Sequence, residues 1–255
     1  TIMKKLLFLL CLFFAFCSFT KVSSQTIKSG EKLVFAGSYN MSGLMTQLAQ
    51  VTMSTENVTT AKNTYLHLSC ELSTYSKWDS FFKIRDLYES YVNPTTLKPS
   101  LYKRNIDEGG WTKKEKYVFK GNTVNSTSKK RNRPETQNTF TIGGSTQDVI
   151  SLLYKVRTMD FSKFKVGQTQ SLMIVFDEKQ IPVTLKYMGK ETVSAGNLGS
   201  KECYKLSIGA KTDALKGKDK NLIWLTADNK KVPTLLKFSI PVGTGKLTLT
   251  SATGI

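Results

Sequence analysis

The stretch Leu66-His67-Leu68-Ser69-Cys70-Glu71-Leu72 alternates between apolar and polar residues. Successive side chains of an extended chain point to opposite faces, so Leu, Leu, Cys and Leu share one face while His, Ser and Glu share the other. This alternation predicts a β-strand with one face packed on a core. The same period-two pattern continues along most of the chain from about residue 33.

The alternation predicts a sheet of many strands. It is clear again in Val232 to Ile240, and turn residues such as Asn93-Pro94, Gly109-Gly110 and Asp177-Glu178-Lys179 separate the apolar runs. Many strands joined by short links predict a mainly β, single-domain fold with a curled, mostly antiparallel sheet: a β-roll, an open barrel or a sandwich-like fold. Further strands are predicted near residues 44–54, 81–92, 115–120, 138–142, 170–177, 181–188, 202–209, 221–227 and 246–250.

One segment follows helical spacing instead. Val149, Leu152, Leu153 and Val156 recur at intervals of three and four, and Ser145-Thr146-Gln147-Asp148 resembles a capping box. We therefore predict one short helix near 146–157, with its apolar stripe on the sheet.

The N-terminal segment has the features of an export signal. Met3-Lys4-Lys5 precedes an unbroken apolar run of eleven residues from Leu6 to Phe16, which is too short for the roughly 20-residue span of a membrane helix. Val22 and Ser24 stand at positions suited to cleavage before residue 25. We predict a signal peptide over 1–24, a single β-rich domain over 25–255, and a periplasmic or secreted protein.

A lipoprotein is the alternative at this signal, because Cys17 could carry a lipid. A lipid-attachment site requires a small residue before the cysteine, and Phe16 is large. A soluble exported protein without an acyl group on Cys17 is therefore favoured.

The chain is strongly basic, with 37 Lys and Arg against 19 Asp and Glu, a formal charge of +18 that falls to +15 when the three lysines of residues 1–24 are removed. Such a charge favours anionic partners, here lipid, glycolipid or acidic polysaccharide, and peripheral contact with a membrane. The alternative is a soluble basic surface with no dedicated partner. Export and the absence of a nucleic-acid motif argue against nucleic acid. The oligomeric state stays open.

The densest basic run is Lys129-Lys130-Arg131-Asn132-Arg133. It lies within residues 121–137, which contain almost no large apolar residue. We predict a loop or a hairpin tip for this segment.

Metal and nucleotide sites are not indicated. Cys70 and Cys203 are the two cysteines beyond the signal, and the sequence leaves open whether they form a disulfide or stay as two buried thiols. No cysteine–histidine pair has metal-site spacing, and the glycine pairs lack the phosphate-loop pattern. We expect no metal and no cofactor.

His67 is the only histidine, and its parity places it on the polar face of its strand. No Gly-x-Ser-x-Gly elbow supplies a nucleophilic serine. We expect His67 to be exposed or half-exposed, without a serine, cysteine or metal ligand within hydrogen-bonding reach.

The richest polar stretch runs from Asp86 to Trp111 and carries five candidate ligand-binding residues. Proline-containing turns predict a hairpin that brings Arg104 close to Tyr88 and Asp86, with a charge-assisted bond between Arg104 and Asp86. Three roles stay open: acid/base chemistry by Asp86 and Glu108, binding of an anionic ligand at Arg104, or a structural cross-strand ion pair. The candidates are Asp86, Tyr88, Arg104, Glu108 and Trp111.

Two further candidates lie in Trp224-Leu225-Thr226-Ala227-Asp228. Trp224 is expected to fill the core, and Asp228 is expected to cap the turn that follows. Both are also candidate ligand-binding residues.

These motifs give the chain a family resemblance. Gly30-Glu31-Lys32-Leu33, the Asp-x-Tyr-Glu-Ser-Tyr hairpin, Glu108-Gly109-Gly110-Trp111, the helix motif from Asp148 and the late Trp-Leu-Thr-x-Asp resemble the exported bacterial family filed as domain of unknown function 3108. The resemblance covers about residues 29–250. It implies a β-rich envelope protein with a curled sheet, and the family supplies no activity to transfer.

Three functions are compatible with these features. The first is a non-catalytic envelope protein that binds or places an apolar or amphiphilic component such as lipid or glycolipid. The second is a hydrolase or lyase of envelope polysaccharide that uses Asp86 and Glu108, and the third is a structural partner in an envelope assembly. An apolar cavity would support the first, two carboxylates about 5 to 10 Å apart in a cleft the second, and a filled core with a flat apolar patch the third.

Overall fold

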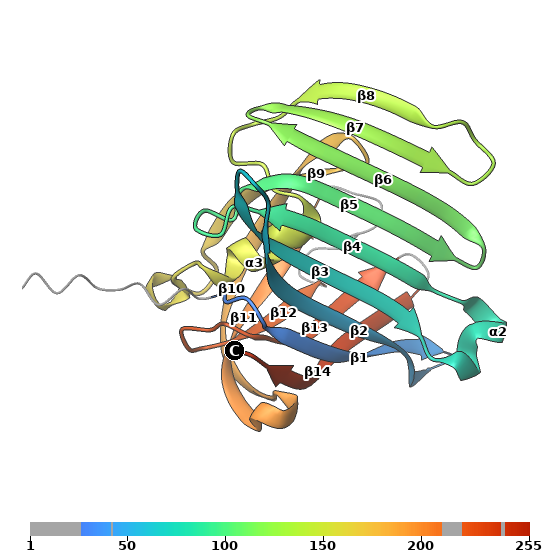
Figure 1. Ribbon diagram of the computed structural model, residues 1–255. Helices are drawn as coiled ribbons and strands as arrows, with labels where there is room; N and C mark the ends of the chain where they lie inside the picture. The colour runs from blue at the N-terminus through green and yellow to red at the C-terminus, as the bar shows by residue number, and fades with distance from the viewer. Residues whose placement is uncertain (1–26, 42, 211–220, 241–242) are drawn as a thin grey trace, which may run out of the picture.

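The computed structural model describes residues 27–41, 43–210, 221–240 and 243–255 (Figure 1). The predicted signal peptide, residues 1–24, lies outside them. Fourteen antiparallel strands form one sheet in the order β8-β7-β6-β5-β4-β3-β2-β1-β14-β13-β12-β11-β10-β9. The strands are β1 Lys32–Met41, β2 Leu44–Thr59, β3 Thr64–Thr74, β4 Arg85–Val92, β5 Pro99–Glu108, β6 Trp111–Lys120, β7 Thr123–Lys130, β8 Thr136–Thr141, β9 Thr169–Phe176, β10 Lys179–Ser194, β11 Ser200–Ala210, β12 Leu222–Thr226, β13 Pro233–Ile240 and β14 Gly243–Thr253.

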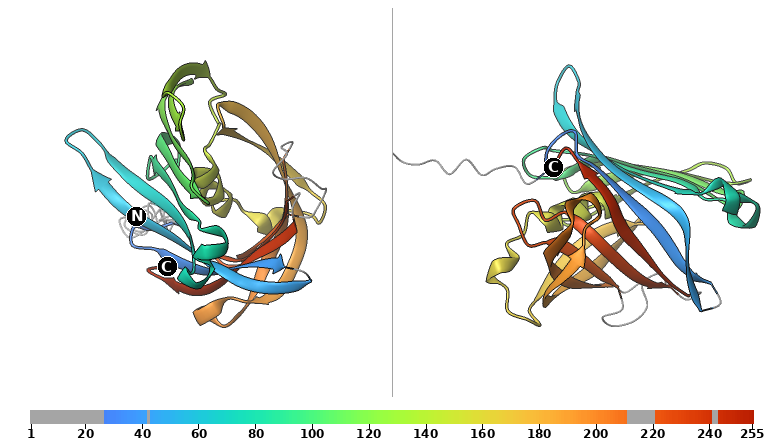
Figure 2. Two further views of the ribbon diagram at one scale, coloured as in Figure 1. Left: turned by 90° about the vertical axis from the view of Figure 1, so that its right-hand side faces the viewer. Right: turned by 90° about the horizontal axis from the view of Figure 1, so that it is seen from below.

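The sheet consists of two meanders that meet where the first and last strands pair. Leu33 lies opposite Ala252, and this β1–β14 ladder joins β2–β8 to β9–β13. The two halves curl toward each other, and the end strands β8 and β9 do not pair with one another (Figure 2). The curled, mostly antiparallel sheet predicted from the alternation is confirmed.

Two segments differ from the predicted strands. Residues 81 and 82, expected in a strand, belong to the short helix α2 (Asp79–Phe82), which follows η1 (Ser76–Trp78). Asp79 accepts a hydrogen bond from Thr74 Oγ1 at 2.6 Å and pairs with Arg85, which turns the chain between β3 and β4.

The segment 121–137, predicted as a loop or hairpin tip, contains the strand β7 and the start of β8, and its basic run 129–133 lies at the tip of this hairpin. The buried face of β7 consists of Val124, Ser126 and Ser128. Two of these three side chains are small and polar, so the strand lacks the apolar alternation by which the other strands were predicted. Lys129 and Lys130 end the strand, and only the residues after them form the turn.

The helix α3 (Val149–Arg157) lies inside the curl, in contact with β3 and β4 on one side and β9 on the other (Figure 2). Asp148 caps it by accepting from the amides of Ile150 and Ser151, and the Ser151 hydroxyl accepts from the Asp148 amide. The predicted helix is confirmed, but its capping box consists of Asp148 and Ser151, one turn after the predicted Ser145–Asp148 start, and the helix begins at Val149. The remaining helical turns are η2 (Phe161–Lys163) and η3 (Gly196–Leu198).

Because walls of the sheet surround α3, its buried surface is wider than the predicted stripe. Ile150 and Tyr154 pack into a core cluster with β1–β7 and β14, whereas Val156 packs into a second cluster with β10–β12. Leu153 contacts both clusters. The helix therefore joins the two halves of the core.

A buried ion pair fixes the end of α3. Arg157 donates from both terminal nitrogens to the two carboxylate oxygens of Glu31, each at 2.6 Å, and also to the carbonyl of Lys230. Both charged side chains are almost completely buried. This bidentate contact ties the helix to the segment before β1 and to the turn after β12.

Candidate ligand-binding site

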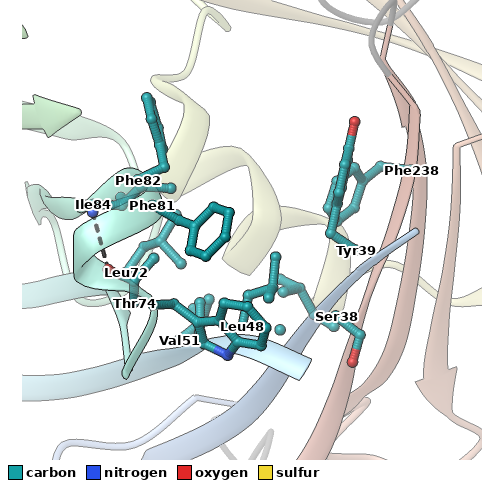
Figure 3. Close-up of a pocket in the computed structure, with 14 residues that line it drawn as sticks. Ser38, Tyr39, Leu48, Val51, Leu72, Thr74, Phe81, Phe82, Ile84 and Phe238 are labelled. Carbon is teal, nitrogen blue, oxygen red and sulfur yellow. Dashed lines mark hydrogen bonds between the residues drawn. The ribbon is translucent and has the colours of Figure 1, made fainter. Parts of the chain in front are cut away.

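An apolar pocket of about 650 Å³ opens at one end of the curled sheet (Figure 3). One wall comes from the strands β1–β3, a second from β13 and β14, and the segment from η1 to α2 covers it. The lining residues are Gly37, Ser38, Tyr39, Leu48, Ala49, Val51, Leu72, Thr74, Trp78, Phe81, Phe82, Ile84, Phe238 and Leu247.

Glycines make room for the pocket and its walls. A Cβ at Gly37 would approach the carbonyl oxygen of Ala49 to 3.3 Å and narrow the floor. Gly245 lies opposite Phe238 in the β13–β14 ladder, and a Cβ there would come within 2.3 Å of the phenyl ring. The absence of a side chain at Gly245 therefore lets the Phe238 ring lie against the sheet as a wall of the pocket.

The covering segment is held to the sheet by several hydrogen bonds. The indole nitrogen of Trp78 donates to the carbonyl of Gln47 at 3.2 Å, and the amide of Tyr75 donates to the carbonyl of Leu48 at 2.9 Å. On the other side, Arg85 pairs with Asp79 at 2.6 Å. Hydrogen bonds from Arg85 and Thr74 hold the pKa of Asp79 below its ordinary value, so its carboxylate stays charged in this contact.

The residues predicted around Arg104 lie on the neighbouring strands β4–β6, outside the pocket lining. Tyr88 lies opposite Arg104, as the predicted hairpin required. The predicted bond between Arg104 and Asp86 is wrong: Arg104 pairs with Glu115 at 2.8 Å and with Asp177. Glu115 is the cross-strand neighbour of Arg104 on β6. The prediction used only the turns of the β4–β5 hairpin, which do not determine the register between β5 and β6.

The two partners of Arg104 come from different halves of the sheet: Glu115 lies on β6 and Asp177 lies in the β9–β10 turn. Asp177, in the β9–β10 turn, also accepts from Lys113 at 2.6 Å. The next residue of that turn, Glu178, accepts from the hydroxyl of Ser126, and its amide donates to the hydroxyl of Tyr117 at 2.9 Å. The β9–β10 turn therefore docks on the inner face of β5–β7 through polar contacts.

Asp86 and Glu108 form a carboxyl pair. Asp86 is 2 % exposed and accepts from the amide of Asp107 at 3.1 Å. Burial raises the pKa of Asp86 to about 6, and the negative charge of the neighbouring Glu108 acts in the same direction. Trp111, after the turn that follows Glu108, is 45 % exposed. None of the three lines the pocket.

The other two candidates lie on the opposite half of the sheet. Trp224 is buried, as predicted, with the ammonium groups of Lys205 and Lys237 each 5.3 Å from the ring centroid. Asp228 accepts from the amides of Lys230 and Lys231 at 2.9 and 3.0 Å and so caps its turn, as predicted.

His67 lies between two glutamates on the face of β3 opposite the core. Its ring nitrogens are 2.9 Å from Glu56 Oε1 and 3.0 Å from Glu89 Oε1, and the ring stacks on Tyr91. The orientation agrees with the prediction, but the side chain is only 12 % exposed because these cross-strand neighbours cover it. No serine or cysteine hydrogen-bonds to His67 in the described structure.

Cys70 and Cys203 are free thiols and do not form a disulfide with each other. Cys70 is half-buried on the inner face of β3, and Cys203 is buried on β11. Burial raises the pKa of the Cys70 thiol to about 12, with Asp86 and Glu71 adding to the effect.

Among the described residues, no group of three histidine, cysteine or acidic side chains could hold a metal ion. The described helices are also too short or too polar to span a membrane.

The pocket was not found from the sequence. Its lining comes from β1, β2, β3, β13 and β14 together with η1 and α2, so the residues meet only through the curl of the sheet. The one local signal is the closely spaced aromatic group Trp78, Phe81 and Phe82. Phe81 and Phe82 of this group fall in the predicted strand 81–92, and Trp78 lies outside it.

Comparison with known families supports this description. The model of the family described as "Protein of unknown function (DUF3108)" matches residues 38–250. The chain belongs to this family. The DUF3108 match confirms the resemblance stated from the hairpin, helix and late tryptophan motifs. No curated protein matches the chain.

One of the similar solved structures shares the architecture of this DUF3108 chain. A β-barrel-like protein of the family DUF1849 from Brucella abortus has a TM-score of 0.56 at 9 % identity, over 87 % of this chain and 96 % of its own. That similarity shows the fold. A proposed lipoprotein from Parabacteroides distasonis has a TM-score of 0.35 at 9 % identity, over 89 % of this chain and 96 % of its own. A proposed exported protein with a YmcC-like fold from Bacteroides fragilis has a TM-score of 0.33 at 8 % identity, with the same coverage.

Proposed function

We propose that this chain is an exported cell-envelope protein that binds an apolar or amphiphilic envelope component, a lipid or glycolipid, without catalysing a reaction. The pocket between α2 and the two sheet walls is the observation that carries this proposal. Its volume of about 650 Å³ lies within the range of small-molecule sites, and its lining is almost entirely aliphatic and aromatic. Each methylene group moved into such a pocket from water gains about 0.8 kcal/mol before ordering costs.

The chemistry of the chain suits an amphiphile more than a wholly apolar ligand. The pocket is open at one end of the sheet, so a polar headgroup can stay in solvent while an acyl chain enters. The formal charge of +18 favours an anionic headgroup, and loss of the signal residues would leave +15.

The carboxyl pair favours hydrolysis less. Asp86 is 2 % exposed and neither carboxyl group lines the pocket, whereas the two carboxyl groups of a glycosidase flank the glycosidic bond that they cleave. A structural partner is expected to have a filled core and a flat apolar patch. This end of the sheet has an open pocket instead.

The test is native mass spectrometry of the protein purified from its own envelope. We expect a mature chain starting near Gln25, without an acyl group on Cys17, that retains a lipid-sized adduct. Ala49→Phe places a ring in the pocket and should reduce both the adduct and binding of a fluorescent fatty acid by at least about tenfold. Leu247→Phe is the second pocket-filling variant in case the first fails to fold.

The matched control is Ala36→Phe, on the same wall but outside the pocket lining. It should retain the wild-type adduct and affinity. A bare mass for the wild type together with no fatty-acid binding would reject the proposal. So would equal binding by Ala49→Phe, Leu247→Phe and Ala36→Phe.

A further inference from the structure

Exposed apolar side chains lie on the segment that covers the pocket and on the two segments next to it. Among the described residues, the large hydrophobic side chains that are exposed are Leu44, Met45, Phe81, Phe82, Trp111, Val166 and Ile255. The first five belong to the start of β2, to α2 and to the start of β6. Phe81 is 77 % exposed and Leu44 is 74 % exposed, although Phe81 also lines the pocket. Patches of this kind mark interaction surfaces.

Hydrogen bonds show that these segments are neighbours. Trp78 of η1 donates to the carbonyl of Gln47, three residues after Leu44. On the other side, the amide of Gly109 donates to the carbonyl of Lys83 at 2.8 Å, and the ring of Phe82 lies so close to Gly109 that a Cβ there would approach it to 2.9 Å. We call the five residues Leu44, Met45, Phe81, Phe82 and Trp111 the apolar rim.

Lysines flank the aromatic part of the rim. The segment Lys77-Trp78-Asp79-Ser80-Phe81-Phe82-Lys83 places an exposed lysine at each end of three aromatic residues. Its one acidic residue, Asp79, is neutralised by Arg85. Arg131 adds another exposed cation beside the β5–β6 turn, where it donates to the carbonyl of Gly110 at 2.7 Å. Aromatic rings that sit at the headgroup level, with lysines reaching lipid phosphates, are typical of interfacial membrane contacts.

We propose that the apolar rim docks the pocket mouth on an anionic membrane surface. Phe81 and Phe82 enter the headgroup region, and Lys77 and Lys83 contact lipid phosphates. The positive charge of the rim favours this partner over a second copy of the chain, whose rim carries the same charge. The docking places the pocket opening at the bilayer, so a lipid can pass between the bilayer and the pocket. This lipid transfer rests on the proposed lipid binding.

Vesicle binding tests the docking. The wild type, from residue 25 onward, is sedimented at low ionic strength with vesicles of phosphatidylglycerol and phosphatidylethanolamine, and with phosphatidylcholine vesicles for comparison. We expect binding to the anionic vesicles that weakens with added salt. Phe81→Ser with Phe82→Ser should weaken it by at least about tenfold. The control Val166→Ser removes an apolar side chain that is 72 % exposed on the segment between η2 and β9, and should bind as wild type.

A charge reversal separates docking from overall basicity. Lys77→Glu with Lys83→Glu should lose binding to anionic vesicles. Lys62→Glu with Lys120→Glu makes the same change in net charge at exposed positions away from the rim, and should retain most of it. Equal loss in the two pairs would show attraction by total charge and overturn the proposal, as would full vesicle binding by the Phe81 and Phe82 variant.

Docking and lipid binding can fail separately. Because Lys77 and Lys83 do not line the pocket, their reversal should leave binding of a soluble fluorescent fatty acid unchanged. Conversely, Ala49→Phe should lose the fatty acid and still bind anionic vesicles. Fatty-acid binding without vesicle binding by the wild type would reject the docking alone, and vesicle binding without fatty-acid binding would reject the pocket alone.

Discussion

Asp86 is a buried acid, and no cation among the described residues forms an ion pair with it. It lies on the inner face of β4, and its neighbours include Glu108 and the amide of Asp107. Burial first, and then Glu108, raise its pKa to about 6. The folded state therefore holds this proton more tightly than the unfolded chain, in which an aspartate titrates near about 3.9.

The sign of this shift predicts how stability changes with pH. Below about pH 4 the Asp86 carboxyl is protonated in both the folded and the unfolded state and does not change the free energy of unfolding. Between about pH 4 and pH 6 its ionisation increasingly lowers the free energy of unfolding, and above about pH 6 this loss stays constant. Asp86→Asn should therefore exceed the wild type in stability by about 2 kcal/mol at pH 8 and match it near pH 4. Urea unfolding at both values measures the difference. Glu135→Gln, at an exposed position, is the control; the same gain at pH 4 and pH 8 for Asp86→Asn would contradict this account.

Single residues were predictable where the cause is local. The turn-capping role of Asp228 follows from the few residues around it, whereas the capping box lies one turn later than predicted, at Asp148 and Ser151. The partner of Arg104 was not predictable in this way, because it depends on the β5–β6 register and on a turn 73 positions away in the chain.

At the scale of elements, the β9–β10 turn closes the curl without strand pairing. Asp177 and Glu178 both have positive φ angles, 46° and 61°, which are uncommon for residues with side chains. Their polar contacts with β5–β7 hold the turn in that conformation. Burial would raise the pKa of Asp177, but hydrogen bonds from Lys113 and Arg104 outweigh it and lower the pKa. The stabilisation is thus present above the unfolded pKa and is lost as pH falls through the lower folded value.

Removing the two charges of this turn should loosen both ends of the sheet. Asp177→Asn with Glu178→Gln leaves Arg104 and Lys113 with Glu115 alone, so we expect a loss of about 2 kcal/mol in unfolding free energy. Amide exchange should accelerate in β7–β10 more than in β1–β3. Glu71→Gln, an exposed position on β3, is the comparison. Unchanged exchange at both edges of the sheet would mean that the turn does not link them.

Strands and helices were predictable where apolar residues recur at the spacing of that element. The alternation of β3 and the spacing of α3 identified both, whereas β7 buries two serines and has no apolar stripe to recognise. Phe81 and Phe82 begin the predicted strand 81–92, yet they belong to α2 and both are exposed. Their exposure follows from their place at the pocket mouth, which only the assembled sheet defines.

For the whole molecule, the sequence predicted the curled sheet and the helix α3, but neither the second short helix α2 nor the pocket. Alternation specifies which face of each strand is buried. It does not specify how far the sheet curls, and the space between Phe81 on α2 and Phe238 on β13 depends on that curvature. The same curvature brings the two core clusters against opposite sides of α3.

Because α3 is shared, the two halves of the sheet should unfold together. Leu153 and Leu236 each contact both clusters, so neither half can open without exposing the core of the other. The chain from residue 25 to 255 should show one calorimetric transition whose van't Hoff and calorimetric enthalpies agree, at roughly 160 kcal/mol near about 60 °C. Leu153→Ala should lower stability by about 2 kcal/mol and keep a single transition, while Lys163→Ala, at an exposed side chain of η2, should change little. Two resolved transitions in the wild type would instead identify two independently folding units, one built on the cluster of β1–β7 and β14 and the other on that of β10–β12.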